Sequence, residues 1–412
     1  MHNGLSLLAP SMTDALLSPP PAHGNAAEVF RAFLRLGLLS FGGPIAHLGY
    51  FHTEFVERRR WCSEETFAEI VAIAQSMPGP ASSQVGFALG LLRAGWSGGL
   101  AAWTAFTMPS ALLMLAFAFG HQLLTGRLGL GVIHGLQLVA VAVVAQAILS
   151  MRKSLAPDAP RMALALAAAL IVFLGFGTLL AIVGGALAGL LLPQTAQCKP
   201  THPLAFRLSK AVGLTAAALL LALLPALHIA AALSNSQPVA VFNAFYRTGA
   251  LVFGGGHVVL PLLEAAVVAP GWVDQQTFLS GYGAAQALPG PLFTFAAYLG
   301  AAIRPSVHPL LLSALALIAI FLPGLLAVIA VLPFWSELRQ RPLVQSTLRG
   351  VNAAVVGVLI AAFLRPVCAS ALHSFFDSVV AVAALIALLR WKLPPWVIVV
   401  AVASLSAFAA IA

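Results

Sequence analysis

The sequence predicts an all-α, polytopic membrane protein built from two repeats of inverted topology, each containing broken or re-entrant helices. Of its 412 residues, 60% are hydrophobic and only 8% are charged, and the mean hydropathy is +0.97. A soluble domain carries about 25% charged residues. Several apolar runs are about 20 residues long, enough to span a bilayer as helices, and they do not alternate in polarity as β-barrel strands do. These runs are Leu100–Gly120, Gly131–Ser150, Val212–Ala232 and Leu310–Leu332.

The charge and cysteine content exclude several other classes. The net charge of +9 would indicate nucleic-acid binding in a soluble domain. Here much of the excess lies in short loops next to apolar runs, where it orients the chain. The three cysteines are isolated, with no CxxC pair and no Cys/His cluster, so we expect no metal, no cofactor and no disulfide framework.

An internal repeat is the third observation. FRAFLRLGLLSFGG (Phe30–Gly43) recurs as FNAFYRTGALVFGG (Phe242–Gly255), and AQSMPGP (Ala74–Pro80) recurs as AQALPGP (Ala285–Pro291). The order and spacing hold over roughly a hundred residues and include matched arginine, glutamine, tryptophan and proline positions. Two repeated halves are typical of transporters whose binding site lies between them.

The repeat sets the expected order of elements along the chain. We expect a disordered tail over residues 1–28, a first repeat over 29–192, a linker with one extra transmembrane helix over 193–237, and a second, inverted repeat over 238–412. In each repeat a segment broken at Gly-Gly precedes one broken at Pro-Gly-Pro, and four further spans follow. The expected later spans are 98–120, 130–150, 161–175 and 177–192 in the first repeat, and 308–332, 350–366, 375–391 and 394–412 in the second.

Loop charges predict the orientation of the two halves. The basic residues of the first half follow its fourth segment, whereas those of the second half are displaced by one segment, as expected if the halves are inverted. The run Glu57-Arg58-Arg59-Arg60 fits this pattern if the first two segments are re-entrant hairpins that turn at Gly42-Gly43 and at Pro78-Gly79-Pro80. Full crossing of the first segment is the alternative.

The broken segments are the candidate site, because non-helical backbone at membrane depth is tolerated only where protein buries it or where it lines a polar cavity. A helix that starts after Pro-Gly-Pro presents free N–H groups and a partial positive charge, which suit an anion. Arginine forks and hydroxyl groups also bind oxyanions well. The candidate substrate-binding residues are Arg35, Gly42, Gly43, Gln75, Pro78, Gly79, Ser82, Arg247, Gly254, Gly255, Gln286, Pro289, Gly290 and Thr294.

Each candidate also has a purely structural interpretation. The Gly-Gly pairs could mediate close helix packing, Arg35 and Arg247 could extend to the membrane interface, and Gln75 and Gln286 could bridge parts of the fold. His47 and His257 do not occupy equivalent positions, so we expect them to serve in packing.

These motifs resemble the chromate ion transporter family in its long, two-domain form. The resemblance rests on FLRLGLLSFGGP, ERRRWCSEETF and AQSMPGP in the first half, and on GALVFGGGHVVLPLLE, GWVDQQTFLSGYGAAQALPGP and RGVNAAVVG in the second. It covers most of residues 28–412, and Gly256 stands where the first half has Pro44. It implies an inner-membrane carrier that exports chromate and confers resistance, with antiparallel halves and with sulfate as a chemically similar dianion.

We therefore expect a secondary transporter working by alternating access, not an enzyme. An inside-negative potential favours outward movement of an anion by about 2.3 kcal/mol per charge per 100 mV. Uptake or exchange of sulfate or another oxyanion is the alternative. An intramembrane enzyme is disfavoured because HExxH does not occur and no Ser/His pair is placed symmetrically in the two halves. The expected partners are the transported anion and the lipid bilayer, with a homodimer as an open alternative and no nucleic acid.

Overall fold

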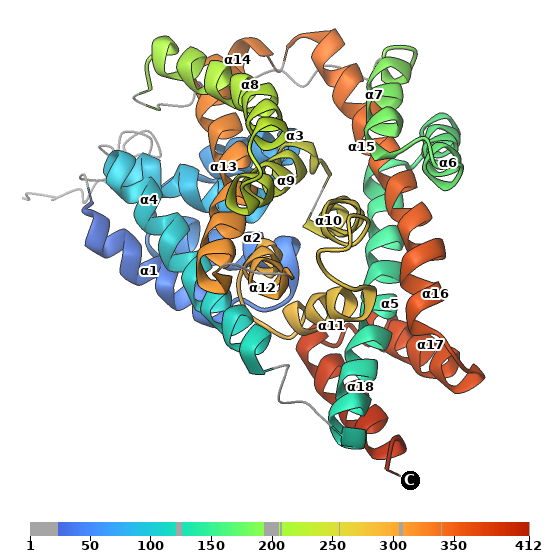
Figure 1. Cartoon of the computed structure of the whole chain (residues 1–412). Coiled ribbons are helices and arrows are strands. Elements are labelled where there is room, and N and C mark those ends of the chain that lie inside the picture. Colours follow the sequence, from blue (N-terminus) through green and yellow to red (C-terminus); the bar gives the residue numbers. More distant parts are fainter. Residues whose placement is uncertain are drawn as a thin grey trace, which may run out of the picture.

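The computed structural model is a bundle of helices and describes residues 24–120, 126–192, 206, 208–254, 256–304, 308–338 and 340–411. No strand occurs among these residues. Within the described part of the chain, five helices are long and apolar enough to cross a membrane, namely those over 81–120, 126–155, 210–233, 309–338 and 342–371. The prediction of an all-α polytopic membrane protein is confirmed (Figure 1).

The described residues of the first half form seven α-helices. They are α1 (Ala26–Leu39), α2 (Gly43–His52) continued by the π-helical turn η2 (Thr53–Arg58), α3 (Glu64–Ser76), α4 (Ala81–Gly120), α5 (Gly126–Leu155), α6 (Ala159–Phe173) and α7 (Thr178–Gly189). Helix α1 begins two residues before the expected end of the tail, because the Asn25 side chain accepts a hydrogen bond from the Glu28 N–H and caps it. The rest of the expected tail, residues 1–23, lies outside the described residues.

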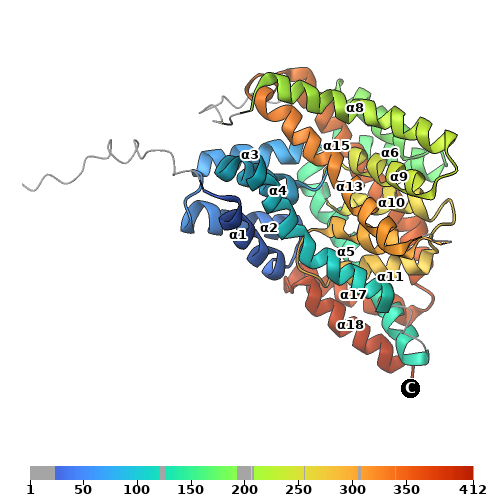
Figure 2. The same ribbon diagram turned by 60° about the vertical axis from the view of Figure 1, so that its left-hand side comes forward.

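The second half follows the helix α8 (Lys210–Leu233), which lies where the extra transmembrane helix was expected. Its elements are α9 (Gln237–Leu251), η4 (Gly256–Val258), α10 (Val259–Val267), α11 (Gln275–Ala285), η5 (Leu292–Thr294), α12 (Phe295–Ala302), α13 (Pro309–Val331), η6 (Leu332–Phe334), α14 (Trp335–Leu338), α15 (Pro342–Ala362), η7 (Phe363–Val367), α16 (Cys368–Ala371), α17 (Phe375–Arg390) and α18 (Pro395–Ala409). Helix α8 runs along the outside of the bundle (Figure 2), and its side chains are mostly exposed, as a lipid-facing span requires.

Helix α4 contains a reversal between the second broken segment and the span expected over 98–120. Ala94 and Gly95 leave the helical conformation, and Gly95 takes a positive φ of 62°. Residues 81–93 then fold back on residues 96–120, so that Gly90 contacts Gly98 with no room for a side chain on either. The second half makes the same turn between two separate helices, α12 and α13, where Gly300 packs on the backbone of Leu312.

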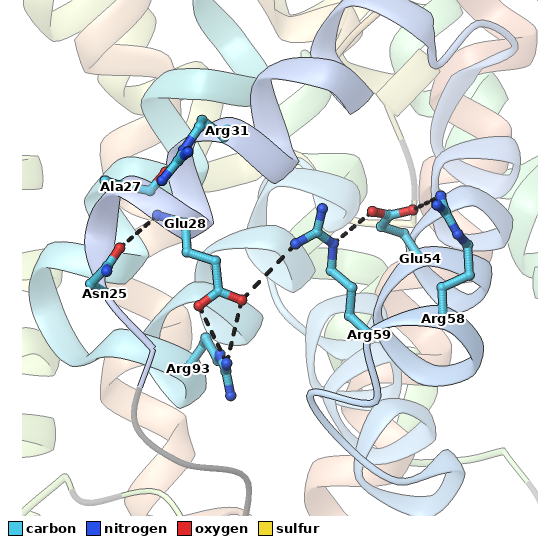
Figure 3. A network of polar contacts seen from close by, with 8 residues as sticks. All are labelled: Asn25, Ala27, Glu28, Arg31, Glu54, Arg58, Arg59 and Arg93. Carbon is cyan, nitrogen blue, oxygen red and sulfur yellow. Dashed lines mark hydrogen bonds and ion pairs between the residues drawn. The ribbon is translucent and has the colours of Figure 1, made fainter.

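The first two segments of each half form pairs of arms that reverse at the breaks. The start of α1, the end of η2 and the end of the 81–93 arm lie together, because Glu28 is within 3.3 Å of Arg93 and 4.0 Å of Arg59 (Figure 3). In the second half, the Tyr298 hydroxyl on α12 donates to the Thr277 carbonyl near the start of α11. The two ends of each such pair therefore lie together, and we call this region the base of that half: it includes Glu28, Arg59 and Arg93 in the first half and Trp272, Thr277, Tyr298 and Arg304 in the second.

The later helices pack across the two halves. Helix α5 of the first half packs against α17 and α18 of the second, and α15 of the second packs against α6 and α7 of the first. Glycines allow this close approach, because Gly135 contacts the backbone of Ala403 and Gly350 contacts that of Gly189. The two halves are thereby joined around the broken segments (Figures 1 and 2).

Candidate functional site

Four places where helices are interrupted, here called the tips, meet inside the molecule. The first tip covers residues 40–43, the second 77–80, the third 252–256 and the fourth 286–291. The Gly79 N–H donates to the Val252 carbonyl at 2.7 Å, and the Gly290 N–H donates to the Ser40 carbonyl at 2.9 Å. Each Pro-Gly-Pro tip is thus bonded to the Gly-Gly tip of the other half, through residues that correspond in the repeat.

Each Pro-Gly-Pro tip is also covered by a proline-containing helix of the opposite half. A Cβ on Gly79 would lie 2.7 Å from Gly324 Cα, one residue after Pro323 in α13. A Cβ on Gly290 would lie 3.1 Å from the Ser110 Oγ, one residue after Pro109 in α4. Both tip glycines have positive φ, 116° and 95°, which side chains rarely adopt.

The first tip leaves open space beside a helix start. Gly42 and Gly43 take positive φ values of 104° and 78°, and α2 begins directly after Gly42. Nothing lies within 4 Å of the point where a Cβ on Gly43 would stand. The first N–H groups of a helix point outward from its start and favour an anion. This helix start is therefore a place where an anion could approach the backbone.

Several buried polar atoms around the first-half tips have no hydrogen-bond partner among the described residues. They are Ser40 Oγ, His47 Nδ1, Ser83 Oγ, Gln84 Oε1 and Thr107 Oγ1. The other ring nitrogen of His47, Nε2, donates a hydrogen bond to the Ser40 carbonyl at 3.1 Å, which fixes the orientation of the ring. Buried polar atoms are nearly always satisfied, so a cluster of exceptions indicates a place for water or a polar ligand.

The second-half tips are better satisfied. The Ser110 hydroxyl donates to Thr294 Oγ1 at 2.8 Å, and the Thr294 hydroxyl donates to the Pro291 carbonyl at 2.8 Å. His257 Nδ1 lies 2.9 Å from the Tyr282 hydroxyl. Gln286 Nε2 at the fourth tip also has no partner among the described residues, so the free donors are the hydroxyl groups of Ser40, Ser83 and Thr107 in the first half and this amide in the second.

The structure brings many of the predicted site residues to the tips, but it uses some of them differently. Gly42, Gly43, Pro78, Gly79, Gly254, Gln286, Pro289, Gly290 and Thr294 lie at or beside the tips, and Ser82 is buried in the first turn of α4. Gly255 lies outside the described residues. The N–H groups of Gly79 and Gly290, expected to face an anion, are occupied in this conformation by carbonyl groups of the opposite half.

The predicted arginines and one glutamine are exposed. Arg35 on α1 and Arg247 on α9 make no hydrogen bond or ion pair with any described residue, and the Gln75 side chain on α3 is exposed as well. Arg35 follows Glu28 by seven residues, about 10 Å along the helix. An arginine at such a depth usually faces a water-filled passage.

Sequence reasoning missed Ser40, Thr107 and Ser110. A signal for them existed, because Ser40 directly precedes the matched Phe-Gly-Gly motif, and Thr107 and Ser110 flank Pro109, which aligns with Pro323. Isolated serines and threonines in an apolar run carry no periodic pattern, however. Their placement became visible only once α4 was seen to cover the fourth tip.

Comparison with known proteins gives consistent matches over most of the chain. The model of the family described as chromate transporter matches residues 27–190 and again residues 239–407. A probable chromate transport protein of Synechococcus elongatus is 29% identical over 398 residues, covering 94% of this chain and 97% of that protein. A chromate transport protein of Pseudomonas aeruginosa is 27% identical and covers 84% of this chain and 82% of its own length.

A third relative, a chromate transport protein of Cupriavidus metallidurans, is 28% identical and covers 81% of this chain and 80% of that protein. No solved structure matches the chain significantly.

Proposed function

The chain belongs to the chromate transporter family, and from this premise we propose that it exports chromate across the inner membrane by alternating access, which would confer resistance. It is a membrane transporter and not an enzyme. The single observation that carries the proposal is the reciprocal pair of hydrogen bonds, Gly79 to Val252 and Gly290 to Ser40. Four helix breaks from two halves meet there, as in carriers whose site lies at a repeat interface.

An inverted arrangement of the two halves is supported by the long spans between them. Residues 96–120 of α4 start beside the first-half arms, and Ala118 near their end lines a cavity with Trp272 and Asp274 at the base of the second-half arms. Helix α13 starts at that second-half base, and beyond its end Trp335 donates to Glu69 on α3. The two bases would then face opposite sides of the bilayer.

The charge distribution supports a cytoplasmic location for the first-half base. By chain order, helices α5, α13 and α17 end on the same side as that base, and the loops there are rich in arginine and lysine. The basic residues concerned are Arg58, Arg59, Arg60, Arg152, Lys153, Arg161, Lys210, Arg341, Arg390 and Lys392. The opposite side carries fewer, namely Arg127, Arg304 and Arg365.

The tips supply the chemistry that a tetrahedral dianion requires. Hydroxyl groups of Ser40, Ser83 and Thr107 can donate hydrogen bonds, and the starts of α2 and α4 contribute their positive dipole ends. Arg35 and Arg247, exposed on the arms leading to the tips, would attract the anion along the path.

Efflux of a dianion needs no proton coupling in this scheme. An inside-negative potential of 100 mV favours it by about 4.6 kcal/mol, at about 2.3 kcal/mol per charge. The buried carboxylates among the described residues are Glu54 and Asp377. Glu54 binds Arg58 and Arg59, and Asp377 binds His134. Both lie near helix ends, away from the tips.

Everted membrane vesicles test the proposal. Vesicles containing the chain should accumulate radiolabelled chromate when the potential is positive inside, and Ser83→Ala with Thr107→Val should lower the initial rate at least tenfold. Thr215→Val on α8, whose hydroxyl donates to the Ala211 carbonyl, is the matched control. Accumulation no greater than in vesicles lacking the chain would reject chromate export. Faster exchange with sulfate than with chromate would favour the alternative of a sulfate or general oxyanion exchanger.

A further inference from the structure

Arg93 and Arg304 occupy matching places at the two bases. Each follows the second proline of its Pro-Gly-Pro motif, Pro80 or Pro291, by thirteen residues. Each ends the short arm after that motif and lies beside a matched tryptophan. The Arg93 guanidinium carbon is 5.5 Å from the ring centroid of Trp61, and the Arg304 backbone N–H donates to the Trp272 backbone carbonyl at 3.0 Å.

Around Arg93 the first-half base is closed by ion pairs (Figure 3). Glu28 contacts Arg93 at 3.3 Å and Arg59 at 4.0 Å. Glu54 in turn accepts from Arg59 at 2.7 Å and from Arg58 at 2.6 Å. The side chain of Arg93 is only 16% exposed. Glu28 therefore ties together α1, the end of η2 and the 81–93 arm of α4.

Around Arg304 the second-half base is open. A cavity of about 240 Å³ is lined by residues that include Trp272, Asp274, Thr277, Tyr298 and Arg304. Arg304 is exposed and makes no ion pair with a described residue. In the alignment of Phe30 with Phe242, the counterpart of Glu28 is Ala240, which carries no charge. The second half therefore has no carboxylate at the position from which Glu28 covers Arg93.

We propose that Arg93 and Arg304 are equivalent docking residues for a tetrahedral dianion at the two ends of the transport path, and that Glu28 closes the first of them. This inference rests on the proposed function. In the present conformation the second-half docking site is open and the first-half site is shut. Opening of the first-half base requires Glu28 to leave Arg93, and that same step exposes the guanidinium to the anion.

Asp274 limits how tightly the open site would hold a dianion. Its carboxylate lines the cavity and accepts hydrogen bonds from the Thr277 N–H at 2.8 Å and hydroxyl at 2.7 Å. The negative charge of Asp274 therefore balances part of the positive charge of Arg304 at this cavity. A site at the mouth of a transport path must release its ion again, so weak binding is suitable there.

Two charge variants at the cavity test the docking role in opposite directions. Asp274→Asn removes the negative charge and keeps a residue that caps α11 well. In vesicles with the second-half base outward, it should lower the half-saturating chromate concentration several-fold, whereas Arg304→Gln should raise it several-fold. Arg365→Gln, which alters another arginine on the same side that contacts Phe173, is the matched control. In vesicles of the opposite orientation, the half-saturating chromate concentrations of all three variants should equal that of the unaltered chain.

A labelling experiment tests the closing role of Glu28 without any transport. Ala302→Cys places a thiol at the cavity, in a chain whose three native cysteines are replaced by serine. Glu28→Gln should slow its reaction with a membrane-impermeant maleimide several-fold, because opening the first-half base favours closure of the other. Glu57→Gln, which loses only a contact to His52, is the matched control.

The outcomes separate this inference from the function on which it rests. Equal half-saturation in Arg304→Gln and Arg365→Gln, with chromate still transported, would overturn the docking role alone. Equal labelling in Glu28→Gln and Glu57→Gln would overturn the closing role. If the unaltered chain moves no chromate, the proposed function falls and the docking role falls with it.

Discussion

Thr294 in the second half and Ser83 in the first occupy matching positions three residues after Pro-Gly-Pro, yet their surroundings differ. Thr294 accepts from Ser110 and donates to the Pro291 carbonyl, whereas Ser83 is buried with no partner among the described residues. At the bases the relation is reversed. The first half is tied by Glu28 and Glu54, and the second half holds a cavity beside Arg304.

This contrast shows that matching positions of the two halves have different contacts within one structure. A carrier that alternates between two sides needs one mouth closed while the other is open. Glu28 stands where the second half has Ala240, so the ion pairs of Glu28 with Arg93 and Arg59 have no counterpart at that position of the second half. The backbone hydrogen bonds between the tips join matching positions in the two halves, whereas the side chains around them differ in their partners.

The largest expected effect separates the two Pro-Gly-Pro tips. Gly79→Ala should abolish folding or transport, because its Cβ would lie 2.7 Å from Gly324 Cα, which is backbone and cannot move aside. In Gly290→Ala the new Cβ would lie 3.1 Å from the Ser110 Oγ and 3.2 Å from the Ser110 Cβ, a milder clash than the 2.7 Å approach to backbone at Gly79. Both also carry the cost of a positive φ, roughly 1–2 kcal/mol. In detergent, the unfolding temperature of Gly79→Ala should lie well below that of Gly290→Ala. Equal decreases in unfolding temperature would show that the two tips are equally constrained.

Loss of the arm arginines should remove transport while the fold remains. Arg35→Ala and Arg247→Ala break no contact with a described residue, so their unfolding temperatures should stay close to that of the unaltered chain. If both attract the anion, chromate accumulation in everted vesicles should be abolished in each. Arg31→Ala is the control. Arg31 lies on α1 one helical turn before Arg35, and its guanidinium donates only to the Ala27 carbonyl. Normal transport in both arginine variants would remove them from the path.

The hydroxyl groups at the tips should respond oppositely in the two halves. Thr294→Val breaks a chain of buried hydrogen bonds, leaves Ser110 without its acceptor, and should cost about 1–3 kcal/mol of stability. Thr107→Val removes a buried hydroxyl that has no partner among the described residues, so stability should hold or rise while transport falls. Unfolding temperature and vesicle transport measured on the same preparations check both. A destabilised Thr107→Val would mean that its hydroxyl serves the fold.

The smallest expected effect is a difference in pH dependence between the two bases. The hydrogen bond that His52 Nε2–H donates to the Glu64 carboxylate at 2.6 Å raises the pKa of His52 above 6.5. Its contribution to stability is therefore present below about pH 6.5 and is lost as the pH rises through the raised pKa. At the second-half base, burial raises the pKa of Asp274, but hydrogen bonds from Thr277 outweigh this and lower the pKa below 3.8. Its contribution is lost on acidification instead.

Unfolding temperatures measured over this pH range in detergent check both signs. His52→Gln should flatten the dependence above about pH 6.5 only, and Asp274→Asn should flatten it at acidic pH only. A reversed pattern would contradict the assignment of these two groups.

Much of the architecture was predictable from the sequence. The helices α5, α8, α13, α17 and α18 lie close to the expected spans, since runs of apolar residues long enough to cross a bilayer leave few alternatives. The breaks at Gly-Gly and Pro-Gly-Pro were predictable because glycine and proline act locally on the backbone. A turn before the span at 98–120 was expected, but its place at Ala94–Gly95 was not predictable, since a single glycine in an apolar run is compatible with a continuous helix.

The candidate site was predictable only in part. The sequence by itself determined that this protein is helical, lies in a membrane and breaks its helices at four matched places, because hydropathy and backbone chemistry are local properties. The tertiary structure alone decided that Gly79 bonds Val252, that Ser83 and Thr107 remain without partners, and that Glu28 covers Arg93. These contacts join residues far apart along the chain, and their partners follow from how the two halves pack against each other.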